Sequence, residues 1–301
     1  MLLFPSHAPA QGDLGHRTLG TVGLDAGTLP RPGLYVADRA LYYAANQVRD
    51  RHGRTIPVPV DLDALANGIG AAIVLEVPRF ATVSASVGLP LAHVSTHTDQ
   101  PEASIDRFGL GDIYVQPLKL GWRLTHLDLV SGYAFYAPTG RFEPGGRGGV
   151  GRGHWTHELS LGGALSLAFG VPWSLSALAS YDLNQRKRGV DITRGETLQI
   201  QGGLGATLLR FIVVGLAGFA QWQVRDDRGA DLPPVLRGAR DRAFGLGPEA
   251  GVLIKALRGK VALRYEHDFG VRARPLGWIV VVGLTVAAWQ PKRTPAHLRG
   301  W

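Results

Sequence analysis

The sequence predicts an all-β protein that folds as a closed antiparallel transmembrane β-barrel of about 12 strands. The first observation is strict alternation: between Trp173 and Asn184, every odd position is apolar and most even positions are small or polar. A period of two residues describes a β-strand whose two faces meet different surroundings. The second observation is that very short and long connections alternate between such segments. This pattern is typical of outer-membrane barrels, which have short periplasmic turns and long extracellular loops.

Composition favours strands over helices and excludes several kinds of chemistry. Charged residues make up 19% of the 301 residues, against about 25% in typical soluble domains. The chain contains 41 glycines, and each costs about 1 kcal/mol in a helix interior. It has no cysteine, which excludes disulfides, zinc thiolates and thiol nucleophiles. No apolar run reaches the roughly 18 to 20 residues of a transmembrane helix, and the longest candidate, residues 277–289, is expected to be a strand.

Twelve strands are expected where the alternation recurs. They lie near residues 34–44, 64–76, 80–90, 110–120, 126–137, 156–169, 173–183, 196–208, 212–224, 243–255, 260–269 and 277–289. Hairpin turns are expected at residues 77–79, 170–172, 209–211 and 256–259. Long loops are expected at residues 46–63, 92–109, 138–155, 184–195 and 225–242. The fourth strand loses its alternation at Gln116 and Pro117, where we expect a β-bulge.

Charge assigns the two faces of these strands. In the eleventh strand the charged face carries Lys260, Arg264, Glu266 and Asp268, and the apolar face carries Val261, Leu263, Tyr265 and Phe269. A basic residue on the lipid face costs about 2 to 4 kcal/mol near the bilayer midplane, so the charged face must point into the lumen. Because unpaired edge groups cost several kcal/mol each in lipid, the first and last strands should pair. An even strand number would place both termini on the periplasmic side.

The predicted barrel spans residues 32–290. Residues 1–31 form a lead-in rich in Gly and Pro, in which Ala8, Pro9 and Ala10 resemble the cleavage site of a signal peptide; the lead-in would then be a remnant of that peptide. Residues 291–301 form a basic tail.

The net charge of +8 comes mainly from basic residues in the expected loops. These residues are consistent with solvated loops or with attraction to an anionic surface such as lipopolysaccharide. They do not gather on one face or helix, so we expect no nucleic-acid partner. The expected partners are membrane lipid, lipopolysaccharide and a small-molecule solute, and the oligomeric state is left open.

Motifs for catalysis and metal binding are incomplete. The Gly-rich run at residues 145–153 lacks the Gly-Lys-Ser/Thr ending of a phosphate-binding loop. His154, His157 and Glu158 lie close in sequence but lack the spacing of a zinc-binding helix. Candidate Ser and His pairs fall on opposite strand faces. We therefore expect no catalytic residues, no metal and no cofactor.

The candidate functional residues are the polar side chains that should line the lumen and could set its selectivity. They are Asp112, Asp128, Glu158, Gln199, Gln201, Gln221, Glu249, Lys255, Arg264, Glu266 and Asp268. The alternative interpretation is a network of ion pairs and hydrogen bonds that merely fills a narrow barrel.

Several segments resemble the MetA-pathway of phenol degradation family of Gram-negative outer-membrane proteins. They include Gly-Thr-Leu-Pro-Arg-Pro-Gly-Leu-Tyr at 27–35, Gly-Leu-Gly-Asp-Ile at 109–113, Tyr-Ala-Pro-Thr-Gly at 136–140, Ser-Tyr-Asp-Leu-Asn at 180–184, Gln-Trp-Gln at 221–223 and Gly-Pro-Glu at 247–249. The resemblance implies an outer-membrane transporter linked to the breakdown of aromatic compounds.

The leading hypothesis is a passive outer-membrane channel for small, aromatic or hydrophobic compounds, without catalysis. One alternative is an embedded hydrolase. Another is a structural or adhesive barrel whose basic loops bind lipopolysaccharide or a partner.

Overall fold

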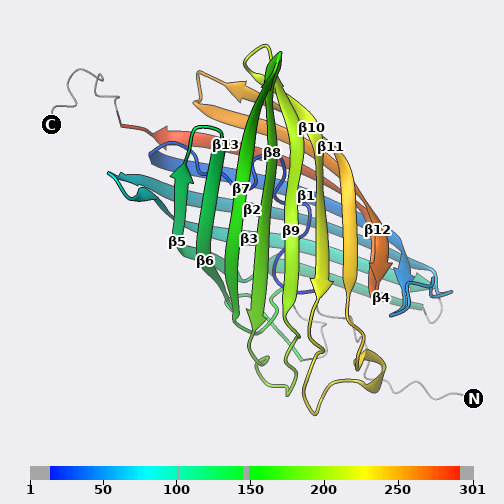
Figure 1. Cartoon of the computed structure of the whole chain (residues 1–301). Coiled ribbons are helices and arrows are strands. Elements are labelled where there is room, and N and C mark those ends of the chain that lie inside the picture. The colour runs from blue at the N-terminus through cyan, green and yellow to red at the C-terminus, as the bar shows by residue number, and fades with distance from the viewer. Residues whose placement is uncertain (1–13, 100–101, 145–148, 292–301) are drawn as a thin grey trace, which may run out of the picture.

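The computed structural model describes residues 14–99, 102–144 and 149–291, which form a single antiparallel sheet closed on itself (Figure 1). Its strands are β1 (Gly33–Arg49), β2 (Val60–Val77), β3 (Ala81–Asp99), β4 (Glu102–Leu110), β5 (Ile113–Arg123), β6 (Leu127–Ala137), β7 (Thr156–Phe169), β8 (Val171–Asn184), β9 (Thr197–Leu208), β10 (Ile212–Gln223), β11 (Arg242–Ile254), β12 (Gly259–Arg272) and β13 (Arg274–Trp289). One short 3₁₀ turn, η1 (Pro234–Leu236), lies between β10 and β11.

The thirteen segments make a barrel of twelve strands, because β4 and β5 share one position. β3 pairs with β4 from Leu91 to Asp99 and with β5 from Thr82 to Gly88. The pairing of β1 with β13, from Leu34 with Trp289 to Arg49 with Arg274, closes the sheet. The predicted fold class and the expected pairing of the first and last strands are confirmed.

The predicted β-bulge is confirmed in β5. The register of β5 shifts against β3 between Ser84 and Ser86, and against β6 between Val115 and Leu118. On β5 the first shift lies between Gln116 and Lys119 and the second between Val115 and Leu118, so both include Pro117. Proline cannot donate a ladder hydrogen bond, so a central strand accommodates it at a bulge.

The prediction of a loop over residues 92–109 is wrong, because β3 and β4 continue through most of it as a hairpin. The outward side chains of β3 are apolar up to Leu91 and then become polar at His93, Ser95 and His97. Apolar alternation therefore ends where the apolar belt of the barrel ends, whereas the strands run on. For the same reason β1 and β2 extend into the expected loop at residues 46–63.

Short connections lie at one end of the barrel, and the long loops lie at the other (Figure 1). We call the ends the short-turn end and the long-loop end. Turns at residues 78–80, 124–126, 170, 209–211 and 255–258 define the short-turn end, where β1 also begins and β13 ends. Loops at residues 50–59, 138–155, 185–196 and 224–241 define the long-loop end. One link at the long-loop end is short, because only Ala273 separates β12 from β13.

The outer surface is apolar and ends in aromatic residues. Large side chains such as Ile69, Leu161 and Leu216 are more than half exposed there. At the long-loop end, Phe244 packs against Trp222 and Phe269. An apolar belt with aromatic borders is the outer surface expected of a barrel in lipid. Within the described residues, no helix is long and apolar enough to cross a membrane.

The described residues that precede β1 lie inside the barrel. We call residues 14–32 the lumen segment. Leu19 packs against Phe219 and other buried wall residues, and Ala26 packs against Val130 and Leu178. The segment approaches β7 so closely that a Cβ on Gly27, whose φ is +71°, would lie 2.2 Å from the carbonyl oxygen of Gly163. Residues 1–13 and 292–301, which carry the predicted cleavage site and most of the predicted basic tail, lie outside the described residues.

A polar pair lies among apolar residues of the outer face on β1 and β2. Asp38 shares its face with the exposed residues Val36 and Tyr42, and Asn67 shares its face with the exposed Ile69. The Asn67 side-chain amide donates to both Asp38 carboxylate oxygens, at 3.0 and 3.2 Å. Asn67 thus supplies the hydrogen bonds that lipid cannot.

Replacing Asn67 with Leu should lower the free energy of unfolding by about 1 to 3 kcal/mol, the cost of leaving a buried polar group unsatisfied. The double variant Asp38→Leu/Asn67→Leu should recover most of this loss, because it removes both partners. Guanidinium unfolding in lipid vesicles, followed by tryptophan fluorescence, measures both values. If the double variant is as unstable as Asn67→Leu, the loss of stability does not come from leaving Asp38 without its hydrogen bonds.

Candidate functional site

The lumen segment is held by ion pairs to inward residues of the wall. Arg17 Nη1 lies 2.5 Å from Glu158 Oε2, and both side chains are largely buried. Glu158 on β7 stands directly opposite the buried Asp182 on β8. Two neighbouring buried carboxylates repel each other, so the guanidinium of Arg17 stabilises both. This pair anchors the segment in the half of the lumen near the long-loop end.

His16 connects the segment to the break between β4 and β5. Its Nε2 lies 2.7 Å from Asp112 Oδ2, and its Nδ1 lies 2.7 Å from Thr156 Oγ1. Asp112 also accepts hydrogen bonds from the backbone N–H groups of Gly140 and Arg152, at 2.9 and 2.7 Å. One buried carboxylate therefore joins the lumen segment, the interrupted strand and the loop at residues 138–155.

A second set of contacts holds the middle of the segment. Arg264 Nε donates to Glu249 Oε2 at 2.9 Å, and its Nη1 donates to the carbonyl oxygen of Gly20. Glu249 also accepts from the backbone N–H of Leu24 at 3.0 Å. Lys260 Nζ lies 2.7 Å from Asp25 Oδ2. The segment thus runs down the lumen from His16, near the long-loop end, towards β1 at the short-turn end.

Buried glutamines complete the polar interior. Gln201 accepts from the backbone N–H of Val22 at 3.1 Å, and Gln199 donates to Asp182 at 3.2 Å. The Gln221 side-chain amide donates to Asp241 Oδ1, and Arg194 Nη2 donates to the other carboxylate oxygen of Asp241. Because most of these side chains are hydrogen-bonded to neighbouring groups, the protein itself fixes their positions.

All predicted lumen residues except Lys255 lie on the inner side of the wall. Lys255 lies in the turn after β11, where its side chain is exposed. Because the apolar alternation runs to the end of β11, the sequence predicts strand through Lys255, whereas β11 ends at Ile254. Asp128 faces inward near the short-turn end, 3.6 Å from Arg123. Asp268 accepts from the Tyr43 hydroxyl at 3.0 Å and from the backbone N–H of Gly277 at 3.2 Å.

Sequence reasoning missed His16, Arg17, Arg194 and Arg274. The predicted lumen set contains six carboxylates but only two basic residues. Such an excess of buried negative charge requires cations from elsewhere in the chain. This imbalance is the signal in the sequence that could have indicated that basic residues of the lead-in enter the lumen.

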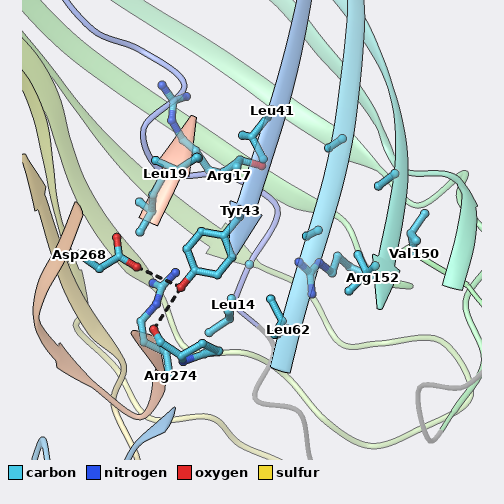
Figure 2. Close-up of a pocket in the computed structure, with 18 of the residues that line it drawn as sticks. Leu14, Arg17, Leu19, Leu41, Tyr43, Leu62, Val150, Arg152, Asp268 and Arg274 are labelled. Atoms are coloured by element: carbon cyan, nitrogen blue, oxygen red, sulfur yellow. Dashed lines mark hydrogen bonds between the residues drawn. The ribbon is translucent and has the colours of Figure 1, made fainter. Parts of the chain in front are cut away.

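A cavity of about 240 Å³ lies between the lumen segment and the wall formed by β1 to β4 and β13 (Figure 2). Apolar side chains form most of its surface: Leu14, Leu19, Leu41, Leu62, Ala64, Ala66, Ala92, Val94, Val150, Phe219 and Ile279. The described charged residues at its surface are Arg17, Arg107, Arg152, Asp268 and Arg274. Figure 2 shows the Tyr43 hydroxyl directed at Asp268. Within the described residues, the cavity is an open space inside the barrel beside the lumen segment.

The constellation of Asp112, His16 and Thr156 resembles a hydrolase relay in composition only. The Thr156 hydroxyl donates to Asn184 Oδ1 at 2.6 Å, and the Thr156 residue is 0% exposed. A nucleophile must reach its substrate with its proton directed to a base. Among the described residues, no cluster of His, Asp or Glu is arranged to hold a metal ion.

A closed barrel with an apolar outer surface and a charged interior defines a protein of the outer-membrane β-barrel class. Residues 45–282 match the family model described as "Putative MetA-pathway of phenol degradation". The chain belongs to this family.

Solved structures support the fold. A COG4313 outer membrane channel from Pseudomonas putida F1 is 14% identical over 87% of this chain and 97% of that one, with a TM-score of 0.75. The translocator domain of the autotransporter NalP from Neisseria meningitidis is 14% identical over 85% and 89% of the two chains, with a TM-score of 0.51. Among curated proteins, no sequence matches the chain.

Proposed function

We propose that the protein is an outer-membrane channel through which small aromatic or hydrophobic compounds enter the cell passively. The observation that carries the proposal is the cavity beside the lumen segment, which is mostly apolar and lies within a closed barrel. Family membership and the likeness to an outer membrane channel support it. Selectivity would reside in the inward polar residues, and no energy source or cofactor would be required.

We propose further that the short-turn end faces the periplasm, as in other outer-membrane barrels. The ends of β1 and β13 would then be periplasmic, while the lumen segment runs back towards the outer side as far as Leu14.

The alternative functions receive less support from the contacts. The relay-like constellation described above is closed to substrate, which disfavours a hydrolase. Several loop arginines are engaged by loop carboxylates, for example Arg240 Nε with Asp226 Oδ1 at 2.7 Å. Such pairing leaves fewer cations for lipopolysaccharide or an adhesive partner.

Conductance of the purified protein in planar lipid bilayers tests the channel. We expect discrete single-channel steps that become smaller when a small aromatic solute is added. A full chain and a variant lacking the lumen segment that both fail to conduct would reject the proposal.

Cysteine labelling tests the orientation, because the natural chain has no cysteine. Arg237→Cys lies in the loop at residues 224–241, and Ala256→Cys lies in a turn of the short-turn end. A membrane-impermeant maleimide should label the first variant in intact cells and the second only after the outer membrane is permeabilised. The reverse pattern would invert the proposed orientation.

A further inference from the structure

The lumen segment packs against one side of the barrel wall. Leu19 packs against residues of β10, β11 and β12, and Ala26 packs against residues of β6 and β8. Leu29 lies so close to β5 that a Cβ on Gly121 would be 2.7 Å from its Cδ1. On the other side, the cavity separates the segment from β1 to β4. The open side of the lumen therefore lies along the inner faces of β1, β2 and β3.

Glycines keep this side open beyond the cavity. On β2, the cavity is lined as far as Ala66, and the next inward position towards the short-turn end is Gly68. A Cβ on Gly68 would have no heavy atom of the described wall or segment within 4 Å, and the same is true of Gly283 on β13. A Cβ on Gly88 of β3 would meet only Tyr114, at 3.8 Å. The open space therefore continues from the cavity towards the short-turn end.

Arg39 stands in this open space. It is the next inward residue of β1 after Leu41, which lines the cavity, and it is paired with Gly68 on one side and with Gly283 on the other. Although it faces the lumen, Arg39 is exposed. Several other inward charged residues are instead buried in the wall: Glu158, Glu249, Arg264, Glu266 and Asp268. The guanidinium of Arg39 thus meets the water of the lumen.

The positive charge of Arg39 has no counter-ion in direct contact. Among the described residues, Arg39 makes no hydrogen bond and no ion pair. The carboxylates of Asp25 and Glu249 lie in its electrostatic surroundings, and each has a cation of its own. Lys260 Nζ lies 2.7 Å from Asp25 Oδ2, and Arg264 Nε lies 2.9 Å from Glu249 Oε2. An exposed cation of this kind stabilises an anion that passes it and repels a cation.

We propose that solutes pass the lumen segment along the inner faces of β1 to β3, and that Arg39 makes this path selective for anions. The inference rests on the proposed channel function, to which it adds a route and the residue that sets the charge preference. Small solutes that carry a negative charge should then pass more readily than cations of the same size.

Reversal potentials of the full chain in planar bilayers, measured across a KCl gradient, test the charge preference. We expect chloride to permeate better than potassium. Arg39→Gln should lower the chloride-to-potassium permeability ratio by about threefold, Arg39→Glu should reverse the preference, and Arg39→Lys should keep it. The preference should also shrink in about 1 M salt, where the Debye length is only about 3 Å.

A loop arginine provides the matched control for these variants. Arg54→Gln, in the loop at residues 50–59, removes the same charge outside the path and should leave the permeability ratio unchanged. A role of Arg39 in folding alone would alter the yield of inserted protein, whereas the ratio would stay the same in the channels that form. An unchanged ratio in Arg39→Gln and Arg39→Glu would overturn the proposal.

A bulky side chain at Gly68 tests the route. Gly68→Phe places a ring in the open space without displacing a neighbour, and should lower the single-channel conductance by about half or more. Gly283→Phe repeats the test on the other side of Arg39. Ala71→Phe, on the lipid face of the same strand as Gly68, is the matched control and should conduct as the natural chain does. Unchanged conductance in both glycine variants would place the route elsewhere.

The same recordings separate this inference from the proposed function. Conductance without a preference for chloride, or conductance that appears only when the lumen segment is removed, would refute the path past Arg39 and leave the channel standing. Absence of conductance both in the full chain and in the variant lacking the lumen segment would reject the channel, and the path with it.

Discussion

Deleting residues 1–29 should raise the single-channel conductance of the barrel severalfold. The described part of this stretch occupies the lumen from the level of Asp112 to that of Gly163. Its removal replaces packed side chains with water and leaves inward charges such as Glu158 and Arg264 exposed to permeating ions. Conductance of a polar barrel rises with the cross-section of its aqueous path.

Deletion of residues 1–13 alone is the matched control for this experiment. It retains every contact described for the lumen segment and should conduct like the full chain. Equal conductance of the full chain and the 1–29 deletion would show that the segment does not limit flow.

Replacing Arg17 with Met should lower the free energy of unfolding by about 3 to 5 kcal/mol, the usual cost of removing one partner of a buried ion pair. Glu158 and Asp182 face each other on β7 and β8, and Arg17 is the cation placed against Glu158. Without it, two buried carboxylates repel each other. Guanidinium unfolding of the protein in lipid vesicles measures the loss.

Two comparisons make this prediction specific. Arg17→Met/Glu158→Gln removes both charges and should recover most of the stability. Arg123→Met breaks the half-exposed contact with Asp128 at 3.6 Å and should cost less than about 1 kcal/mol. The loss in Arg17→Met should also shrink at low pH, since protonation of the carboxylates removes their repulsion. A loss that does not change with pH and persists in the double variant would mean that Arg17 acts by packing alone.

These two variants address different properties of the same segment. The deletion measures how much of the aqueous path the segment occupies. Arg17→Met measures how strongly one buried pair attaches it to the wall. If the segment moves during transport, the attachment must be weak enough to break, and Arg17→Met should then conduct better than the full chain.

The sequence by itself determined the barrel, its face assignment and its bulge. Each follows from local pattern: alternation separates lipid from lumen, the charges of Arg264, Glu266 and Asp268 mark the inner face, and Pro117 interrupts the ladder. These features depend on neighbouring residues and on the high cost of unpaired polar groups in lipid.

Only the tertiary structure decided what fills the lumen. The contacts of His16 with Asp112 and of Arg17 with Glu158 join residues about a hundred or more positions apart in the chain, and no strand period predicts such pairs. The tertiary structure also decided the length of β3 and β4. Their pairing continues beyond Leu91, where the apolar pattern of the sequence ends. The cavity, finally, exists because the lumen segment leaves space along β1 to β4, and packing between distant segments is not encoded in any local pattern.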